Sequence, residues 1–123
     1  DSVYAASLFA EMVSVTNKCP TDIIKELEKE FGKFVMVEDN LHFAPEYKTV
    51  IEKIIFEDKK LPDFSNKVEK VNYEDGCKVY FENGDFVICR FSGTEPLLRI
   101  FAESNNAATA SEYISDFKEF LNI

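Results

Sequence analysis

The spacing of apolar residues changes near Val68, and this change limits the folds open to the chain. Before Val68, apolar side chains recur mostly at the three- and four-residue intervals of helices, apart from residues 33–43. After Val68, they alternate along short runs. Asn83-Gly84 separates two of these runs and favours a hairpin, because both residues tolerate positive φ. Hairpin-linked strands with flanking helices pack as a layer of helices against a sheet.

The same patterns predict the individual elements. In chain order we first expect helices over 2–15 and 20–31, a strand over 33–43 with a break near Asn40, and a helix from Pro45. Strands over 68–73, 77–81, 86–90 and 97–102 follow, and then a last helix capped by Asn105 or Asn106. The expected fold class is α+β, with helices on one face of a mostly antiparallel sheet of four to five strands.

Composition restricts the functions available to this fold. The 123 residues are 46% hydrophobic and 30% charged, which is enough for one hydrophobic core. The net charge of -9 argues against nucleic-acid binding, which needs a basic face. No apolar run is long enough to span a membrane and no secretory signal is recognisable. The three cysteines lack metal-ligand spacing, so reduced, buried thiols in a cytoplasmic protein are expected.

A base-stacking module is one alternative that stays open at this point. Tyr73, Tyr80, Phe81 and Phe86 lie on predicted strands, and aromatic side chains on a sheet can stack on bases. Aromatic residues at this spacing belong to a hydrophobic core more often, and the acidic net charge opposes the idea further.

One polar loop carries the clearest chemical signal. Of the 14 basic residues only Arg90 and Arg99 are arginine, and they bracket this loop between two apolar runs. Arginine offers a planar fork that grips phosphate or carboxylate with two hydrogen bonds. Between the arginines lie the hydroxyls of Ser92 and Thr94, and Gly93, which lets the backbone turn sharply and approach a ligand. Such a set predicts an anion-binding cradle. The alternative is a plain hairpin whose arginines pair with surface carboxylates.

The loop Arg90-Phe-Ser-Gly-Thr-Glu-Pro-Leu-Leu-Arg99 resembles the phosphate-binding signature of the α-D-phosphohexomutases. In that family the pattern is Arg-x-Ser-Gly-Thr-Glu-Pro followed by a second arginine, and every fixed position is present here. Residues 1–6 and 8–12 are similar to the helix that ends the third domain of these enzymes. The resemblance therefore implies the fourth, C-terminal domain of a phosphoglucomutase or phosphomannomutase.

This resemblance implies a domain organisation. Residues 1–15 would be a helix left over from the third domain, 16–19 a linker and 20–123 the C-terminal phosphate-binding domain. The fold would resemble that of the TATA-binding protein. The missing first three domains of the same chain would be its partners, and no nucleic acid or membrane is expected.

It also implies a mechanism. A phosphoserine in the first domain exchanges phosphoryl groups with the sugar through a bisphosphate, so hexose 1-phosphate and hexose 6-phosphate interconvert. Mg²⁺ is held by an aspartate-rich loop in the second domain. Neither motif is found here, so the chain alone should not catalyse the reaction, and it should bind no metal.

The resemblance assigns roles within the loop. The residues expected to bind the phosphate of a phosphosugar are Arg90, Ser92, Gly93, Thr94 and Arg99, with Glu95 and Pro96 orienting the loop. The alternative is a free-standing anion-binding or interaction module without mutase activity.

Overall fold

Residues 1–33 fold as two helices in a computed structural model that describes all 123 residues. Helix α1 spans Ser2–Thr16, and the Asp1 carboxylate caps it by accepting hydrogen bonds from the Val3 and Tyr4 amides at 2.9 and 3.3 Å. Helix α2 spans Pro20–Phe31 and ends at Gly32, whose φ of 89° suits glycine. Both helices confirm the sequence-based prediction.

These two helices form one compact unit, and residues Phe34–Ile123 form the other. Neither helix contains a buried residue, and apolar side chains such as Val3 and Val15 are 74% and 78% exposed. By contacts, α2 therefore groups with α1 and not with the residues that follow it. The functional boundary expected at residue 20 stays a prediction.

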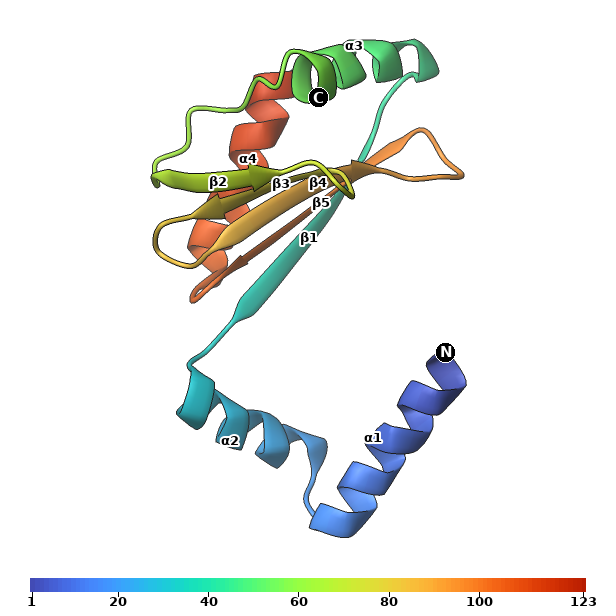
Figure 1. Cartoon of the computed structure of the whole chain (residues 1–123), viewed down its shortest axis with the longest axis vertical. Helices are drawn as coiled ribbons and strands as arrows, with labels where there is room; N and C mark the ends of the chain where they lie inside the picture. Colours follow the sequence, from blue (N-terminus) through green and yellow to red (C-terminus); the bar gives the residue numbers. More distant parts are fainter. The chain divides into compact units, whose positions relative to one another are not determined.

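The second unit is built on a five-stranded sheet. Its strands are β1 (Val35–His42), β2 (Val68–Asn72), β3 (Cys77–Phe81), β4 (Phe86–Phe91) and β5 (Leu97–Ser104). Their order is β1-β5-β4-β3-β2 and every neighbouring pair is antiparallel (Figure 1). The α+β prediction is confirmed. The break expected near Asn40 is absent, because β1 pairs continuously with β5 from Val35 to His42.

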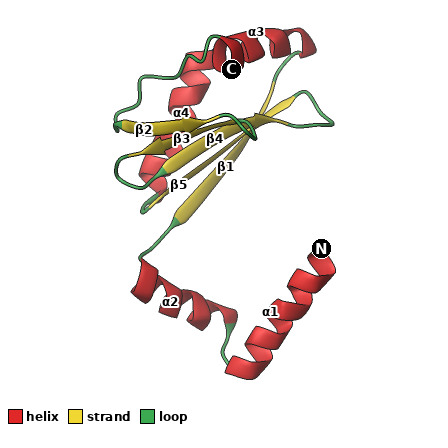
Figure 2. Ribbon diagram, viewed as in Figure 1, coloured by secondary structure: helices red, strands yellow, loops and turns green.

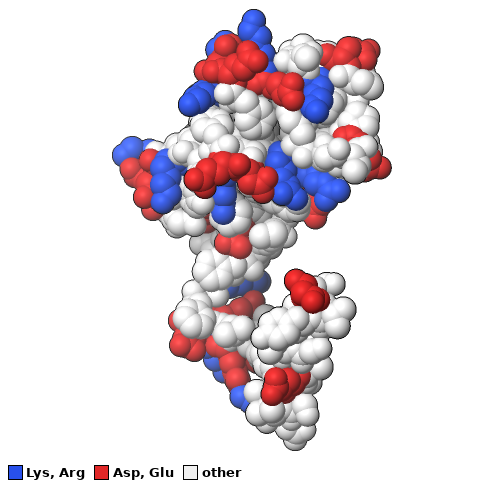
Figure 3. Space-filling view, turned by 45° about the vertical axis from the view of Figure 1, so that its right-hand side comes forward, with Lys and Arg blue, Asp and Glu red and all other residues white.

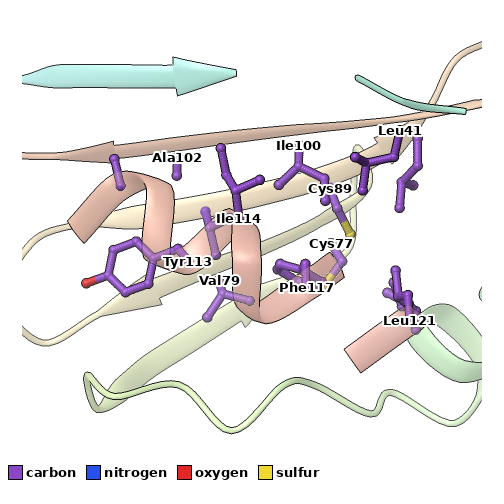
Figure 4. Packing of buried hydrophobic residues seen from close by; sticks show 14 of the residues in the cluster. Leu41, Cys77, Val79, Cys89, Ile100, Ala102, Tyr113, Ile114, Phe117 and Leu121 are labelled. Carbon is purple, nitrogen blue, oxygen red and sulfur yellow. The ribbon is translucent and has the colours of Figure 1, made fainter. Parts of the chain in front are cut away.

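One face of this sheet carries the core. Helix α4 (Ala107–Leu121) packs there, and Asn106 caps it by accepting a hydrogen bond from the Thr109 amide at 2.9 Å. Buried side chains alternate along the strands, as expected when only one face is covered. The main buried strand and helix residues are Leu41, Val79, Phe81, Val87, Leu98, Ile100, Ala102, Ala110, Tyr113, Ile114, Phe117 and Leu121. Figure 4 shows part of this core, with Val79, Ile100 and Phe117 among the labelled side chains. The other face, which we call the open face, carries no helix of this unit (Figure 1).

The helix expected from Pro45 consists of three short segments. A 3₁₀ turn η1 (Pro45–Tyr47) leads into α3 (Lys48–Glu52) and then into a π-helical segment η2 (Lys53–Glu57). The wider π turn is closed by a 2.8 Å hydrogen bond from the Asp58 amide to the Lys53 carbonyl. Ile51 and Ile55 are buried along this stretch and join the core.

The β3–β4 turn is tied to α4 by a polar network. The Tyr113 hydroxyl donates to Asp85 at 2.9 Å and accepts a hydrogen bond from the Asn66 amide group at 2.8 Å. Asn83 donates to the same carboxylate at 2.8 Å. Gly84 has a φ of 90°, but Asn83 does not have a positive φ and acts through its side chain instead. This buried network is satisfied, so it fixes the turn.

The three cysteines have different surroundings. Cys77 and Cys89 face each other across β3 and β4, are fully buried and lie side by side in the core (Figure 4). Contact with Cys77 and burial raise the pKa of the Cys89 thiol well above its usual value. The expectation of buried, unbridged thiols is confirmed for these two, whereas Cys19 is exposed.

Acidic and basic side chains are interspersed over the face of the molecule seen in Figure 3. With a net charge of -9, no broad positive field surrounds the chain, so an anion must be held by a local cluster of cations. No helix combines the length and the apolar character that crossing a membrane requires.

Replacing Asp116 with asparagine should stabilise the chain at neutral pH. The Asp116 Oδ2 atom is buried without a hydrogen-bond partner, and burial, with nearby Glu112, Glu119 and Asp63, raises the pKa of this carboxyl group. A raised folded-state pKa means that stability falls as pH rises from the unfolded value of about 3.9 through the folded value. We expect a gain of about 0.5–1 kcal/mol at pH 7 and little gain at pH 3, by urea unfolding. An equal effect at both pH values would contradict this explanation.

Candidate functional site

The two arginines lie directly opposite each other. In the register of β4 and β5, Arg90 pairs with Arg99, next to the buried pair Cys89 and Ile100. Because side chains alternate between the two faces of a sheet, both arginines project from the open face. Side chains directly opposite in an antiparallel pair have Cβ atoms about 5 Å apart. The hairpin thus starts the two arginine side chains from neighbouring positions on the open face, at the base of its loop.

Only one of these arginines has an internal counter-charge. Arg90 donates from Nη1 to Asp75 Oδ2 at 3.0 Å. Arg99 is half-buried and takes part in no side-chain hydrogen bond or ion pair. Like charges placed directly opposite on a sheet destabilise the pair. An anion bound between the two arginines would relieve this repulsion.

The loop between them is held by its own backbone. The Ser92 amide donates to the Leu97 carbonyl at 2.8 Å, and the Leu97 amide donates to the Glu95 carbonyl at 2.8 Å. The Phe43 amide reaches the Pro96 carbonyl at 3.4 Å, which ties the loop to the chain just after β1. The loop projects beyond the end of the sheet (Figure 2). The loop therefore has a defined backbone conformation, and its residues 93–96 are exposed.

A hollow of about 240 Å³ lies against this loop. It is lined by Phe43, Pro45, Lys48, Ser92, Gly93, Thr94, Glu95 and Pro96. Neither hydroxyl of the loop, on Ser92 and Thr94, donates to a protein group, so both are free to donate to a ligand. The structure thus brings Ser92, Gly93 and Thr94 together with Lys48, which sequence reasoning did not identify. Neither arginine lines this hollow; both project from the open face at the base of the loop.

Gly93 departs from its expected role in shaping the turn. Its φ is not positive, unlike those of Gly32, Gly76 and Gly84, so the turn does not depend on glycine at this position. A Cβ atom added at Gly93 would meet nothing within 4 Å. The open space leaves its amide accessible, which is compatible with the expected close approach of a ligand.

Glu95 and Pro96 contribute to the loop through their backbone carbonyls. Both residues are exposed, and the Glu95 carboxylate makes no hydrogen bond or ion pair. An orienting role for the Glu95 side chain therefore stays a prediction, whereas the two carbonyls bond to Leu97 and Phe43.

The β2–β3 turn also reaches the site, through Asp75 and Gly76. Gly76 has a φ of 89°, and a Cβ atom there would lie 2.6 Å from the Cys89 carbonyl oxygen and 2.7 Å from the Arg90 Cβ atom. Only glycine allows this close approach. Local sequence marks this Asp-Gly pair only as a turn after a strand, because its contact with Arg90 depends on how β3 pairs with β4.

Arg90 also borders a second hollow, of about 460 Å³. Its rim carries the carboxylates of Glu52, Glu57 and Asp75, and its walls carry Phe56, Tyr73 and Phe91. Burial raises the pKa of Tyr73 to about 12, so its hydroxyl remains protonated at neutral pH. Three carboxylates repel an anion, which makes the loop side of Arg90 the better place for phosphate.

The aromatic residues considered for base stacking do not share one surface. Phe81 is 1% exposed and stacks on Tyr113 in the core, with ring centroids 4.2 Å apart. Tyr80 and Phe86 lie on the open face, where Lys78 sits 3.8 Å from the centroid of the Phe86 ring. These rings are half-buried under lysine side chains and are not a free stacking platform.

No group of three or more His, Cys, Asp or Glu side chains is arranged to hold a metal ion. The sequence resemblance implies Mg²⁺ ligands in another domain and not in this chain, so no step on this chain is assigned to a metal.

Comparison with known proteins gives concordant matches. The family model for the phosphoglucomutase/phosphomannomutase C-terminal domain matches residues 12–120. A phosphoglucomutase/phosphomannomutase of Thermococcus kodakarensis is 33% identical over 89 residues, which are 72% of this chain and 18% of that protein. A probable phosphoglucosamine mutase of Methanothermobacter thermautotrophicus is 29% identical over 111 residues, covering 89% of this chain and 23% of that protein. The chain spans about a fifth of the length of these curated relatives.

Proposed function

This chain belongs to the phosphoglucomutase/phosphomannomutase C-terminal domain family, and we propose that its β4–β5 loop binds the phosphate group of a hexose phosphate. The observation that carries the proposal is the pair of opposed arginines, of which Arg99 has no internal partner. A dianionic phosphate offers both arginines a counter-charge and can accept bidentate hydrogen bonds from their guanidinium groups.

The loop would complete the phosphate contacts. The hydroxyls of Ser92 and Thr94 would donate to phosphate oxygens, and the accessible Gly93 amide would donate a further hydrogen bond. Such preorganised donors position a substrate and do not themselves break bonds. The role proposed for this domain is therefore to hold the phosphate that is not being transferred.

The remaining chemistry is proposed for a longer protein. By family membership, three further domains would supply the phosphoserine and the Mg²⁺ loop, and hexose 1-phosphate and hexose 6-phosphate would interconvert through a bisphosphate. A cytoplasmic location is proposed with the same activity. The sugar preference is not assigned, because both phosphoglucomutases and phosphoglucosamine mutases are among the relatives.

An NMR titration of the ¹⁵N-labelled chain with glucose 6-phosphate and glucose 1,6-bisphosphate tests the proposal. One loop supplies only part of the binding free energy, so we expect a Kd of about 1 mM or weaker. Amide shifts should concentrate at residues 90–99, and glucose without phosphate should produce none. Shifts scattered over surface lysines would mean nonspecific ion binding and would contradict a phosphate site at this loop.

A further inference from the structure

We propose that Asp75 is a positioning residue that holds the Arg90 guanidinium ready for the phosphate, an inference that rests on the proposed function. Asp75 lies in the turn between β2 and β3, 15 residues before Arg90 in the sequence. A carboxylate repels an anion, so Asp75 would be an unexpected neighbour of an anion site unless it acted on Arg90.

The contact leaves most of the Arg90 fork free. The only hydrogen bond between the two side chains joins Nη1 of Arg90 to one oxygen of Asp75, at 3.0 Å. A guanidinium group has five N–H donors, so Nη2 and Nε stay available to a ligand. Asp75 thus holds the arginine by one nitrogen without occupying the pair of donors that bidentate binding needs.

The turn that carries Asp75 is itself fixed against β4. Gly76 approaches the Cys89 carbonyl and the Arg90 Cβ atom so closely that a methyl group would clash with both. On the other side of Asp75, the Glu74 amide donates to Asn72 Oδ1 at 2.7 Å, and Asn72 Nδ2 donates to Glu74 at 3.2 Å. The Asp75 backbone is thus held on both sides.

The neighbouring charge explains why Arg90 needs such a partner. Arg99 lies directly across the hairpin, so the two guanidinium groups repel each other when no anion is present. An arginine side chain also has many rotamers, and ordering them on binding weakens affinity. A carboxylate anchored beside Arg90 reduces both costs before the ligand arrives.

The ion pair is too exposed to serve mainly as a stability device. The Arg90 and Asp75 side chains are 44% and 78% exposed, and exposed pairs contribute little to folding stability. Its effect should therefore be seen in ligand binding and in the mobility of Arg90, with little change in melting temperature.

The affinity of the Asp75→Asn variant for glucose 6-phosphate distinguishes a positioning role from simple charge repulsion, because the two predict changes in opposite directions. Asp75→Asn removes a negative charge beside an anion site, so electrostatics alone would tighten the binding of glucose 6-phosphate. If Asp75 positions Arg90, the same substitution weakens binding by about threefold to tenfold, as expected for freeing one long side chain. Glu74→Gln is the matched control: it removes the same charge one residue earlier, where no contact with arginine exists. The glutamine keeps a carbonyl oxygen that can still accept the hydrogen bond from Asn72 Nδ2, so the turn should be preserved.

The test uses NMR titrations of the 123-residue chain with glucose 6-phosphate, for the parent, Asp75→Asn and Glu74→Gln proteins. We expect a higher Kd for Asp75→Asn and an unchanged or slightly lower Kd for Glu74→Gln. If Asp75→Asn binds as tightly as Glu74→Gln, or more tightly, Asp75 is not a positioning residue and acts only as a competing charge.

A second measurement needs no ligand. The Nε–Hε order parameter of Arg90 should fall in Asp75→Asn and stay unchanged in Glu74→Gln. An unchanged Arg90 order parameter in Asp75→Asn would overturn the inference. Failure of the proposed function looks different: the parent chain would then show no shifts at the loop, whatever the mobility of Arg90.

Discussion

Arg99→Ala is expected to weaken the binding of glucose 6-phosphate about tenfold to a hundredfold, which is about 1.5–3 kcal/mol for the loss of one charge-assisted contact. The melting temperature should change little, because Arg99 makes no hydrogen bond or ion pair within the chain. The same NMR titration measures the affinity, and thermal unfolding followed by circular dichroism measures stability.

Two further variants sharpen this prediction. Arg99→Lys keeps the charge but loses the planar fork, so it should recover only part of the affinity. Lys70→Met removes a positive charge from an exposed residue of β2 away from the loop, and it should leave the affinity nearly unchanged. If Lys70→Met weakened binding as much as Arg99→Ala, the ligand would be responding to overall charge and not to a built site.

Arg90→Ala should behave like Arg99→Ala in affinity but not in its local effects. Without Arg90, Asp75 loses its only side-chain partner, and the unpaired carboxylate then repels the ligand. The loss of affinity should therefore be at least as large as for Arg99→Ala. Comparing the two variants thus shows the difference between Arg90, which is paired with Asp75, and Arg99, which has no ion pair within the chain.

Sequence reasoning predicted the strands and the loop because their signals are local. Phe86–Phe91 and Leu97–Ser104 are apolar runs on either side of a Gly- and Pro-containing segment, and hairpins are defined by such neighbours. The final helix was predicted from an apolar stripe at helical spacing. Phe120 of this stripe is half-buried and its other members are all buried: Ala110, Tyr113, Ile114, Phe117 and Leu121.

The arrangement of the site was harder to predict because it depends on register and on distant segments. That Arg90 opposes Arg99, and not a residue one or two positions along, follows from how the loop closes the hairpin. Lys48 reaches the loop from α3, a helix more than forty residues earlier in the chain. No local pattern marks such a contact.

The π-helical segment after α3 has a similar explanation. Apolar spacing predicts a helix over this region but cannot distinguish α from π turns, since both bring Ile51 and Ile55 toward the core. The contact of Gly76 with β4 could not be predicted either. A glycine after aspartate indicates only a turn until the neighbouring strand is placed.

Gly76→Ala is expected to cost more stability than an alanine at any of the other three glycines of this chain. Its φ of 89° is unfavourable for alanine, by about 1–2 kcal/mol. The added Cβ atom would also lie 2.6 Å from the Cys89 carbonyl oxygen, a backbone atom that cannot move without disturbing the β3–β4 pairing. Together these effects should cost about 3 kcal/mol or more, measured as the free energy of unfolding in urea.

Gly84→Ala separates the two causes. Gly84 has nearly the same φ, 90°, but a Cβ atom there would meet nothing within 4 Å. It should therefore cost only the conformational part, about 1–2 kcal/mol. Equal losses in the two variants would show that the β2–β3 turn can move away from β4, and the tight packing proposed around Arg90 would then be wrong.

The binding consequence follows from the second contact of Gly76. Its added methyl group would lie 2.7 Å from the Arg90 Cβ atom, so the arginine must shift from its place opposite Arg99. If the Gly76→Ala variant folds, it should thus bind glucose 6-phosphate less tightly than the Gly84→Ala variant. Its amide resonances at residues 89–91 should already be shifted before any ligand is added. Because glycine contributes no side chain to the ligand, a loss of affinity in the folded variant would come from displacing Arg90 and its partner Asp75. This variant is therefore a direct test of how the fold builds the site.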